Sequence, residues 1–407
     1  MSSVTPPILD KLMMIKTAEM TGCPILSFFT GAGFLDIGFL SNNFNVVWHN
    51  EYHKAFVKGF EYGMSAMGYS GHSAKVQNTE SIINIGPNEI LNQAFKGAQP
   101  PKLFGVIGGP PCPDFSVGGK NRGREGDHGK LSEVYLNRVL ELNPAFFVFE
   151  NVPGLLRTSK HRAFLIQILR KLNNRFALDI KILNALEFGV PQDRERVFIV
   201  GFNYSWLKKN CKGHQIKKIT ASSNDLLRLE ELSAREFFKV HQHWFPWPSN
   251  PDLKDAKKKF IWPNKKGDAE FSVQGKNPKE LMVGTYICDT DLSKLPNSQE
   301  HFRPKSSKFH EIIEGDVSRK SFKRLHRSRY SPAAAYGNNE VHLHPFLPRR
   351  LTVREAMMIQ SVPEKYALPP EMTLSDKFKT IGNGVPVKMA NALASSISDF
   401  IERGCDG

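Results

Sequence analysis

The stretch FFTGAGFLDIGF, residues 28–39, runs from apolar residues through two glycines into a second apolar segment. This order predicts a buried strand that ends at Phe29, a turn through Gly31 and Gly33, and then a helix. Glycines in such a turn let a ligand lie against the backbone. Asp36 replaces the third glycine of the dinucleotide fingerprint GxGxxG, so the motif alone is weak evidence for a nucleotide site.

The same alternation of short apolar runs and helical stretches continues to residue 201. Helices are expected at 52–67 and 131–142, and the apolar runs predict strands at 24–29, 45–50, 103–109, 146–151 and 196–202. Such alternation is typical of an α/β protein with a doubly wound, mostly parallel sheet.

Residues 202–345 lose this rhythm and mix Pro, Lys, Asn and aromatic residues without a clear period. We therefore predict a smaller, irregular domain over 202–345, and a sheet domain formed by 1–201 together with 346–407.

Helical patterns return near the C-terminus. Thr352 and Glu355 have the T-x-x-E spacing that predicts a capping box at a helix start. A last helix is expected from near Pro386 to about Phe400.

The chain has 407 residues, of which 40% are hydrophobic, enough to bury a large core. No stretch approaches the roughly 18–20 consecutive apolar residues of a membrane span, and the N-terminus lacks the apolar core of a signal peptide. We therefore expect a cytoplasmic protein without a membrane partner. The cysteines are odd in number, scattered and never spaced as CxxC, which predicts reduced thiols and no structural zinc site: Cys23, Cys112, Cys211, Cys288 and Cys405.

The formal net charge of +15 indicates a polyanionic partner, because Lys and Arg that neutralise phosphates release condensed counterions. Residues 202–345 contain 26 Lys or Arg and 16 Asp or Glu, and so carry +10 of that total. A solvated basic surface is the ordinary meaning of one charge run, but a regional excess favours nucleic acid. The densest cluster is expected to contact DNA phosphates: Lys320, Lys323, Arg324, Arg327 and Arg329.

A single cysteine follows the third apolar run in FGVIGGPPCPDFSVGG, residues 104–119. Cys112 stands between Pro111 and Pro113, in a loop at the carboxyl end of the predicted sheet, where open α/β folds bind ligands. Most lone cysteines are small buried hydrophobes. Here a polar, glycine-rich loop favours an accessible thiolate nucleophile, and the stiff backbone fixes its angle of attack.

Charged residues accompany three other predicted strands. Glu51 ends the second strand, where an acid can accept hydrogen bonds from ribose hydroxyls. Glu150 also ends an apolar strand, and such surroundings favour the protonated form that a general acid needs. Arg194 and Arg196 alternate as they lead into the last strand, so both face one side and suit an oxygen whose charge grows during reaction. Each group taken alone is equally compatible with a surface position.

Taken in order, six motifs resemble the motif series of the DNA cytosine-5 methyltransferases, of the bacterial restriction-modification type: FFTGAGF, GGPPCPDFS, ENVPG, QDRERVFIVG, RRLTVREAMMIQSVPE and GNGVPVKMANALA. The match covers most of the chain apart from 202–325. The resemblance implies a Rossmann-like sheet domain that binds S-adenosylmethionine and a variable region that recognises double-stranded DNA. It also implies a C-terminal helix that folds back beside the first motif, and no metal cofactor.

The resemblance assigns roles to individual residues. Cys112 would attack carbon 6 of a flipped-out cytosine, Glu150 would donate at ring nitrogen 3, and Arg196, supported by Arg194, would hold the carbonyl oxygen. Ser116, at the end of the nucleophile motif, is expected among the DNA contacts. The residues expected to contact the cofactor are Phe29, Gly31, Gly33, Glu51, Tyr52, Asn78, Pro111, Leu131, Asn383 and Val385.

Two positions depart from the family pattern. Pro113 and Asp114 follow the nucleophile where the family usually has Gln, which leaves open how the loop closes over the base. Asn78 stands where the family usually has an acid, and is expected to accept a hydrogen bond from the adenine amine.

Other functions stay open at this stage. An RNA (tRNA) cytosine-5 methyltransferase shares the catalytic motifs, but its nucleophile motif tends to end in Thr rather than Ser116, and the large variable region favours DNA. An inactive DNA-binding regulatory protein is disfavoured by the intact Cys112, Glu150 and Arg196. The resemblance further implies a bacterial, monomeric enzyme that protects DNA from a restriction endonuclease acting on the same site without a stable complex.

Two histidine pairs raise the question of a metal. His241 with His243, and His342 with His344, are spaced so that each pair can share a face. Because no Cys or acid stands beside them in the sequence, we expect packing or loop roles and no metal.

Overall fold

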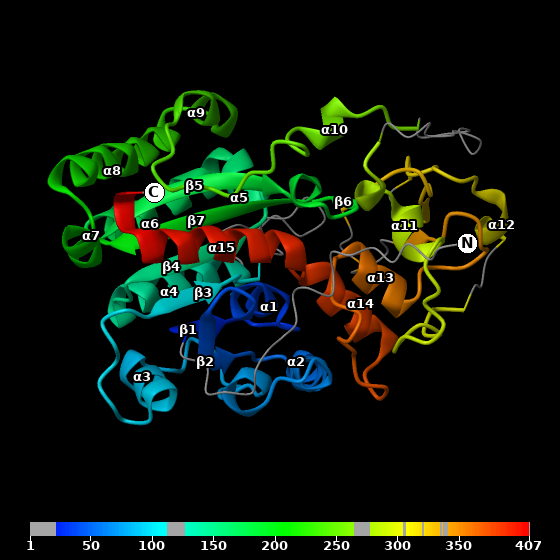
Figure 1. Ribbon diagram of the computed structural model, residues 1–407, viewed down its shortest axis with the longest axis horizontal. Coiled ribbons are helices and arrows are strands. Elements are labelled where there is room, and N and C mark those ends of the chain that lie inside the picture. Colours follow the sequence, from blue (N-terminus) through cyan, green and yellow to red (C-terminus); the bar gives the residue numbers. More distant parts are fainter. Residues whose placement is uncertain are drawn as a thin grey trace.

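The computed structural model describes residues 22–111, 127–263, 277–303, 307–319, 321–333, 336 and 341–406. Over these residues the chain forms a six-stranded sheet with helices on both faces, and a smaller, largely irregular part beside it (Figure 1). Within the described ranges, no helix combines the length and the apolar character needed to cross a membrane.

The sheet has the strand order β2-β1-β3-β4-β7-β5. Strands β1 to β4 run parallel, and β7 pairs antiparallel with both β4 and β5. The expected doubly wound, mostly parallel sheet is therefore confirmed. Its strands are β1 (Cys23–Phe28), β2 (Phe44–Asn50), β3 (Gly105–Gly108), β4 (Phe146–Asn151), β5 (Phe176–Asn184) and β7 (Glu195–Asn203).

Five of the six strands lie where the apolar runs predict them. The exception is β5, which the sequence patterns did not indicate, because Asp179 and Lys181 interrupt its apolar residues. Asp179 is nevertheless completely buried, so its charge must be met by partners from elsewhere in the chain.

Helices bury one apolar cluster on each face of the sheet. One face is covered by α1 (Phe34–Leu40), α2 (Lys54–Ala66), α13 (Val353–Ile359), α14 (Leu374–Asn383) and α15 (Val387–Arg403). The other is covered by α3 (Pro87–Phe95), α4 (Asp127–Leu142), α5 (Gly154–Arg157) and α6 (Ser159–Asn173).

The C-terminal helix α15 packs directly on α1, as the resemblance implied. A Cβ added to Gly38 would lie 2.6 Å from Ala390, so the two helices approach as closely as their backbones allow. The capping box before α13 is also present: the Thr352 hydroxyl accepts from the Glu355 N–H at 3.1 Å, and Glu355 accepts from the Thr352 N–H at 2.8 Å.

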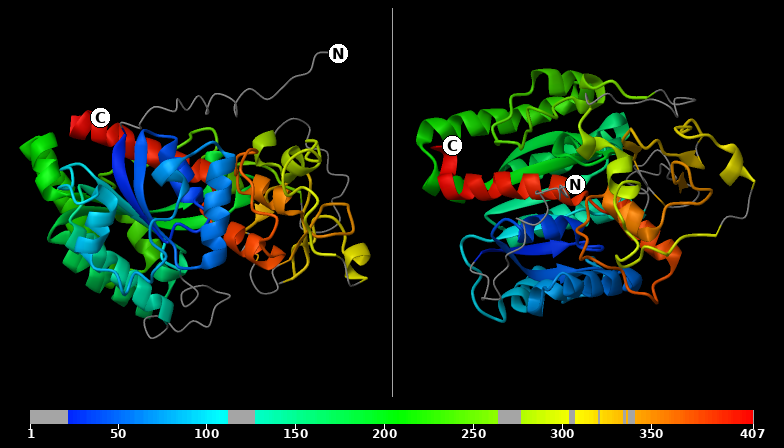
Figure 2. Two further views of the ribbon diagram at one scale, coloured as in Figure 1. Left: turned by 90° about the horizontal axis from the view of Figure 1, so that it is seen from below. Right: turned by 45° about the vertical axis from the view of Figure 1, so that its right-hand side comes forward.

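Residues 204–240 form three helices that pack on the sheet: α7 (Tyr204–Asn210), α8 (Gly213–Asp225) and α9 (Ala234–Val240). Leu226 and Leu229, just after α8, and Phe237 of α9 are buried in the same cluster as α6. Both views show these green helices beside β5, away from the yellow and orange part of the chain (Figures 1 and 2). Their placement differs from the expected start of a second unit at residue 202, because short amphipathic helices cover the β5 edge although their surface is basic.

Over its described residues, the irregular part has short elements: α10 (Ala256–Lys259), α11 (Val283–Ile287), α12 (Lys308–Glu311), β8 (Lys323–Arg324), β9 (Ser331–Pro332) and β10 (His342–Leu343). β10 pairs with β8, and β9 pairs with β6 (Gln192–Asp193) beside the sheet. Its apolar residues form small separate clusters, one of which joins α11 to α13. Polar contacts must therefore hold much of this part together.

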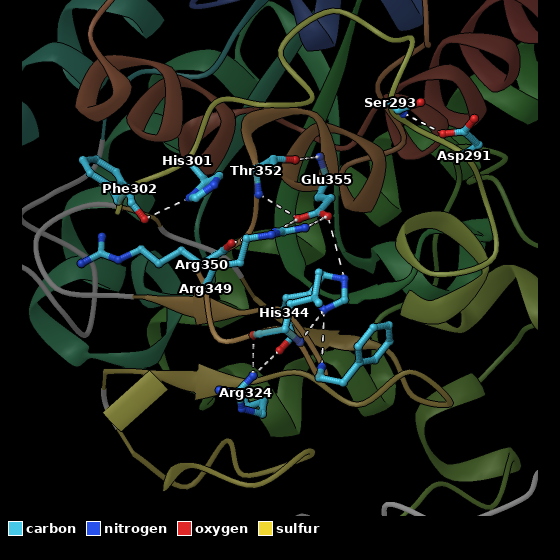
Figure 3. A network of polar contacts seen from close by, with 12 residues as sticks. Asp291, Ser293, His301, Phe302, Arg324, His344, Arg349, Arg350, Thr352 and Glu355 are labelled. Atoms are coloured by element: carbon cyan, nitrogen blue, oxygen red, sulfur yellow. Dashed lines mark hydrogen bonds and ion pairs between the residues drawn. The ribbon is translucent and has the colours of Figure 1, made fainter. Parts of the chain in front are cut away.

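A polar network that includes Arg324, His344 and Glu355 ties the irregular part to α13 (Figure 3). The Nδ1 of His344 accepts from the Leu347 N–H at 3.1 Å, and its Nε2 lies 3.9 Å from Glu355. Arg349 donates to both oxygens of Glu355 at 2.8 Å. The buried Arg324 guanidinium donates to the main-chain carbonyls of Phe309, Ile312, His344 and Leu347.

Cys211 and Cys405 form a disulfide across 194 residues. Cys211 follows α7 and Cys405 follows α15, and Gln215 donates to the Cys405 carbonyl at 2.8 Å. Cys23 and Cys288 are free. The expectation of reduced thiols is therefore wrong for this one pair, because the fold brings together two cysteines whose spacing in the sequence gives no sign of a bridge.

Candidate active site

The loop after β1 has left-handed backbone at three of the expected cofactor residues. Phe29, Gly31 and Gly33 have φ angles of 54°, 58° and 76°. A Cβ on Gly33 would lie 2.7 Å from the ring of Phe60, so glycine is required there for packing as well. A Cβ on Gly31 would meet only the Phe29 carbonyl, at 4.0 Å, so the space beside Gly31 is open.

Glu51, immediately after β2, holds this loop. Its two carboxyl oxygens accept from the Gly31 N–H at 2.9 Å and from the His53 N–H at 2.7 Å. Burial raises the pKa of Glu51, and the hydrogen bonds from His53 and Gly31 partly counteract that effect. Each oxygen keeps a further acceptor position, which recognition of a hydroxyl requires. The next residue, Tyr52, is 70% exposed and can stack on a planar ligand.

Two supports of the loop were not found from the sequence. The Thr30 hydroxyl donates to the buried Asp36 at 2.7 Å, and the Tyr366 hydroxyl donates to the Ala32 carbonyl at 2.8 Å. From the sequence, Asp36 is recognisable only as a replacement of the third fingerprint glycine. An acid in the first turn of an apolar helix was the signal that this position has a structural partner.

Asn383 and Val385 flank Gly384 at the end of α14. A Cβ on Gly384 would lie 2.3 Å from the ring of Phe34, which places this segment against the start of α1. Asn383 is exposed and Val385 is buried. The first loop and the GNGV motif, 350 residues apart in the sequence, therefore meet at one end of the sheet (Figure 1).

Arg194 joins a third motif to this segment. Its side chain is buried and donates to the Gly382 carbonyl at 2.5 Å. Alternation along the chain predicted that Arg194 and Arg196 would face one side together. In the structure Arg194 donates to the GNGV segment and Arg196 pairs with Glu150, and the charges of both arginines act on the Glu150 carboxyl.

Three other residues expected to contact the cofactor are Pro111, Leu131 and Asn78. Pro111 follows β3 and Leu131 lies on α4, and both are partly buried. Asn78 is buried with its amide already engaged: its oxygen accepts from the Glu80 N–H at 2.8 Å, and its nitrogen donates to Gln93 at 3.2 Å. A hydrogen bond from an adenine amine to Asn78 would have to share that oxygen.

Glu150 and Arg196 form a largely buried ion pair across neighbouring strands. The Arg196 Nε lies 2.8 Å from a Glu150 carboxyl oxygen, and the side chains are 12% and 10% exposed. Burial raises the pKa of Glu150, and the charges of Arg196 and Arg194 partly counteract that effect. This direction agrees with the expectation for a general acid at the end of an apolar strand.

Gly109 brings Glu150 against the loop that leads to Cys112. A Cβ on Gly109 would lie 2.5 Å from a Glu150 carboxyl oxygen. The Asn151 amide donates to the Pro110 carbonyl at 3.5 Å, so both residues that end β4 border this loop. Cys112 and Ser116 lie outside the described residues. Pro111, the last described residue before Cys112, lies at the same end of the sheet as Glu150.

The residues of the basic cluster expected to contact DNA differ in how accessible they are to a ligand. Arg324 is 4% exposed. Its guanidinium donates hydrogen bonds to main-chain carbonyls of irregular segments, which have no partner in a β-ladder. The structure therefore gives Arg324 an internal role, contrary to the expected DNA contact. Lys323 is partly buried beside it, and Lys320 lies outside the described residues.

The two remaining arginines of the cluster are more accessible but also have protein partners. Arg327 pairs with Glu314 at 2.7 Å, and its guanidinium lies 4.9 Å from the centre of the Phe346 ring. Arg329 donates to the Pro263 carbonyl and stacks on Tyr330 at 4.8 Å. Such contacts hold each guanidinium in place while leaving further donor positions for a phosphate.

The two histidine pairs have different surroundings in the structure. His342 is buried, and burial lowers its pKa to about 3, while His344 belongs to the Arg324 network. His241 and His243 instead converge on Asp179 of β5, which accepts from them at 3.1 and 2.8 Å. Burial alone would raise the pKa of Asp179, but the hydrogen bonds from both imidazoles lower it overall. Sequence reasoning missed Asp179 because 62 residues separate it from His241.

Comparison with known proteins agrees with this arrangement. The family model for C-5 cytosine-specific DNA methylase matches residues 23–399. The Type II methyltransferase M.NmeDI of Neisseria meningitidis serogroup C is 40% identical over 387 residues, covering 93% of this chain and 84% of that protein. The Type II methyltransferase M.MthTI of Methanothermobacter thermautotrophicus is 30% identical over 389 residues, covering 93% and 98%.

Solved structures share the fold at lower identity. A DNA modification methyltransferase encoded within an E. coli prophage has a TM-score of 0.61 and 21% identity, with 94% of this chain and 100% of that chain covered. The Dnmt2 methyltransferase of S. pombe has a TM-score of 0.54 and 14% identity, with 93% and 98% covered. These identities support the fold alone, whereas the family model and the M.NmeDI match cover nearly the whole chain. The chain therefore belongs to the C-5 cytosine-specific DNA methylase family and is a DNA cytosine-5 methyltransferase that uses S-adenosylmethionine.

Proposed function

We propose that the enzyme works through a covalent bond between Cys112 and a cytosine that has left the double helix. A stacked cytosine cannot present carbon 6 to a thiol, so the base is extruded at a cost of about a few kcal/mol. The Cys112 thiolate adds to carbon 6 and makes carbon 5 nucleophilic. Bound S-adenosylmethionine supplies the methyl group. Loss of the carbon-5 proton and expulsion of the thiolate restore the aromatic ring.

The buried Glu150–Arg196 pair is the observation that carries this proposal. Protonated Glu150 donates at ring nitrogen 3, so negative charge from the thiolate does not accumulate on the ring. Arg196 donates to the cytosine carbonyl oxygen, whose charge grows as the adduct forms. The 2.8 Å contact between them supports this assignment, because it brings both side chains together from neighbouring strand ends.

The residues around the first loop fit S-adenosylmethionine. Glu51 has acceptor positions left for the ribose hydroxyls, and Tyr52 has an exposed ring for the adenine. The open space beside Gly31 lets the ligand approach the backbone. Further contacts are proposed for Phe29, Gly33, Asn78, Pro111, Leu131, Asn383 and Val385.

Replacing Gly31 with valine is expected to weaken S-adenosylmethionine binding at least about tenfold, because the side chain fills the open space and strains a left-handed position. Calorimetric titration of the cofactor into the purified variant measures this. Gly71→Val is the matched control: Gly71 has a φ of +62° and nothing within 4 Å of its added Cβ, and it is not among the residues proposed to contact the cofactor. Equal affinity of Gly31→Val and Gly71→Val would contradict the proposed cofactor position.

We propose that the part of the chain that reads DNA begins near Pro248, after the helices that cover β5, and extends to about residue 345. The sheet domain then comprises the residues before Pro248 together with 346–407. Within the reading part, Lys320, Lys323, Arg327 and Arg329 are proposed to contact DNA phosphates, and Ser116 approaches the DNA from the catalytic loop.

Replacing Lys323 and Arg329 with glutamine is expected to weaken binding to all DNA sequences and to lower the slope of log affinity against log salt by about one per lost contact. Fluorescence anisotropy with duplexes of several sequences, over a range of salt, measures the slope. Lys171→Gln is the control, since Lys171 is exposed in the last turn of α6, at the sheet edge opposite the site. An unchanged slope in the double variant would remove these residues from the phosphate contacts.

We further propose that the enzyme acts as a monomer and protects DNA from an endonuclease that cuts the same site. The names of its relatives, which are Type II methyltransferases, support the protective role. Bisulfite sequencing of DNA from a host that expresses the chain tests the proposal. We expect protected cytosines in one sequence context. Complete conversion of the DNA, with methylation found in tRNA instead, would overturn it.

A further inference from the structure

Asp179, His241 and His243 place three metal-ligating atoms together at the edge of the sheet away from the catalytic loop. Asp179 lies on β5, His241 follows α9, and His243 lies two residues further on. One oxygen of Asp179 is 3.1 Å from the Nε2 of His241 and 2.8 Å from the Nδ1 of His243. All three ligand atoms lie within 4.8 Å of one another, the only such group of three among the described residues.

The other oxygen of Asp179 is already occupied by the backbone. It accepts from the N–H groups of Trp244 at 2.8 Å and Phe245 at 3.0 Å. These bonds fix the carboxylate, so that its remaining oxygen points at both imidazoles. The ring of His241 is fixed as well, because it stacks on Phe237 with 4.7 Å between centres. The donor set is therefore held by the fold before any ion arrives.

His241 lies between two carboxylates, and this arrangement favours a cation. Its Nε2 faces Asp179, and its Nδ1 lies 3.3 Å from an oxygen of Asp225. A neutral imidazole has one N–H and cannot donate to both acids. If a metal takes the Nε2 lone pair, the proton stays on Nδ1 and Asp225 accepts it. Metal-binding histidines usually have such a carboxylate partner on the second nitrogen.

Charge and geometry agree with a small divalent ion. Asp179 and Asp225 place two carboxylates beside His241, and one divalent cation balances their two negative charges. Two imidazole nitrogens and a carboxylate oxygen suit Zn²⁺, whose tetrahedral ligands lie roughly 3.3 Å apart at its usual bond lengths. The His243 side chain is 29% exposed, so the ion can enter from solvent and keep a water molecule as its fourth ligand.

We propose that Asp179, His241 and His243 form a Zn²⁺ site, with Asp225 as the outer partner of His241. The ion joins β5 to the segment that leaves α9 and leads to the DNA-reading part of the chain. It lies away from Glu150 and takes no part in methyl transfer. The site stands independently of the proposed catalytic mechanism, because none of its residues belongs to that mechanism.

The test uses the full-length chain without a histidine tag, freed of metal with a chelator. Calorimetric titration with Zn²⁺ should show one ion per chain, and Co²⁺ should give the visible absorption bands of a four-coordinate site. Zn²⁺ should also raise the Tm. His243→Ala should abolish the Co²⁺ bands and the rise in Tm, and Asp225→Asn should weaken Zn²⁺ binding about 10-fold to 100-fold.

The variants are chosen so that the protein still folds. His243→Ala leaves the bonds from Asp179 to Trp244 and Phe245 intact, whereas removing Asp179 would break them. His214→Ala is the matched control, since His214 is exposed on α8 and should bind Zn²⁺ like the wild type. The proposal is overturned if the wild type binds no Zn²⁺, or if His243→Ala binds it as well as the wild type does.

Discussion

Replacing Cys112 with serine is expected to lower the rate of carbon-5 methylation at least about 10³-fold, as loss of a nucleophile does in other covalent enzymes. A serine hydroxyl is far less ionised than a thiol near neutral pH, so it does not add to carbon 6 at a useful rate. Transfer of labelled methyl groups to duplex DNA, under single-turnover conditions, measures the chemical step separately from product release.

Two comparisons make this result specific. Cys288→Ser is the control, since Cys288 is a free, partly buried cysteine of the irregular part and should leave the rate unchanged. A duplex with 5-fluorocytosine at the target should become covalently trapped on the wild type in the presence of cofactor, because fluorine cannot leave carbon 5 as a proton does. A Cys112→Ser enzyme of normal rate, or a wild type that is never trapped, would refute the covalent mechanism.

Replacing Glu150 with glutamine is expected to lower the methylation rate about 10²-fold to 10³-fold, within the range for loss of a general acid. Glutamine keeps a hydrogen-bond donor but cannot transfer a proton. Glu141→Gln is the matched control, because Glu141 is an exposed carboxylate on α4. Equal rates for Glu150→Gln and the wild type would exclude the role proposed for Glu150.

The pH dependence of this step follows from the direction of the pKa shift. Burial raises the pKa of Glu150, with Arg196 and Arg194 opposing that effect. The active, protonated form is therefore complete below the raised pKa and is lost as pH rises through it, so the single-turnover rate should fall on the alkaline side. The Glu150→Gln variant should lack this alkaline fall. A fall of the same shape in the variant would assign it to another group.

Much of the sheet could be predicted because its signals are local. Strands β1, β2, β3, β4 and β7 are apolar runs bounded by polar or glycine-rich turns, and the capping box at Thr352 is complete within four residues. The positions of Glu51 and Glu150 beside strand ends could be expected for the same reason, since each closes an apolar run. Strand β5 could not be predicted, because Asp179 interrupts its apolar run and the partners that allow Asp179 to be buried come from distant segments.

The assignment of the basic residues shows the limit of such reasoning. Net charge marks residues 202–345 as cationic, but it does not tell a cation that faces solvent from one that holds the chain together. Arg324 donates to carbonyls at four positions of the irregular part, and α7, α8 and α9 bury apolar residues in the core clusters despite their basic surface.

By itself, the sequence determined the order of five strands along the chain and the family that the motifs resemble. The tertiary structure alone decided which of those residues touch: Glu150 with Arg196, Arg194 with Gly382, Asp179 with two histidines, and Cys211 with Cys405. The physical reason is that a hydrophobic period acts over a few residues, whereas a buried charge or thiol finds its partner only after folding has brought distant segments into contact.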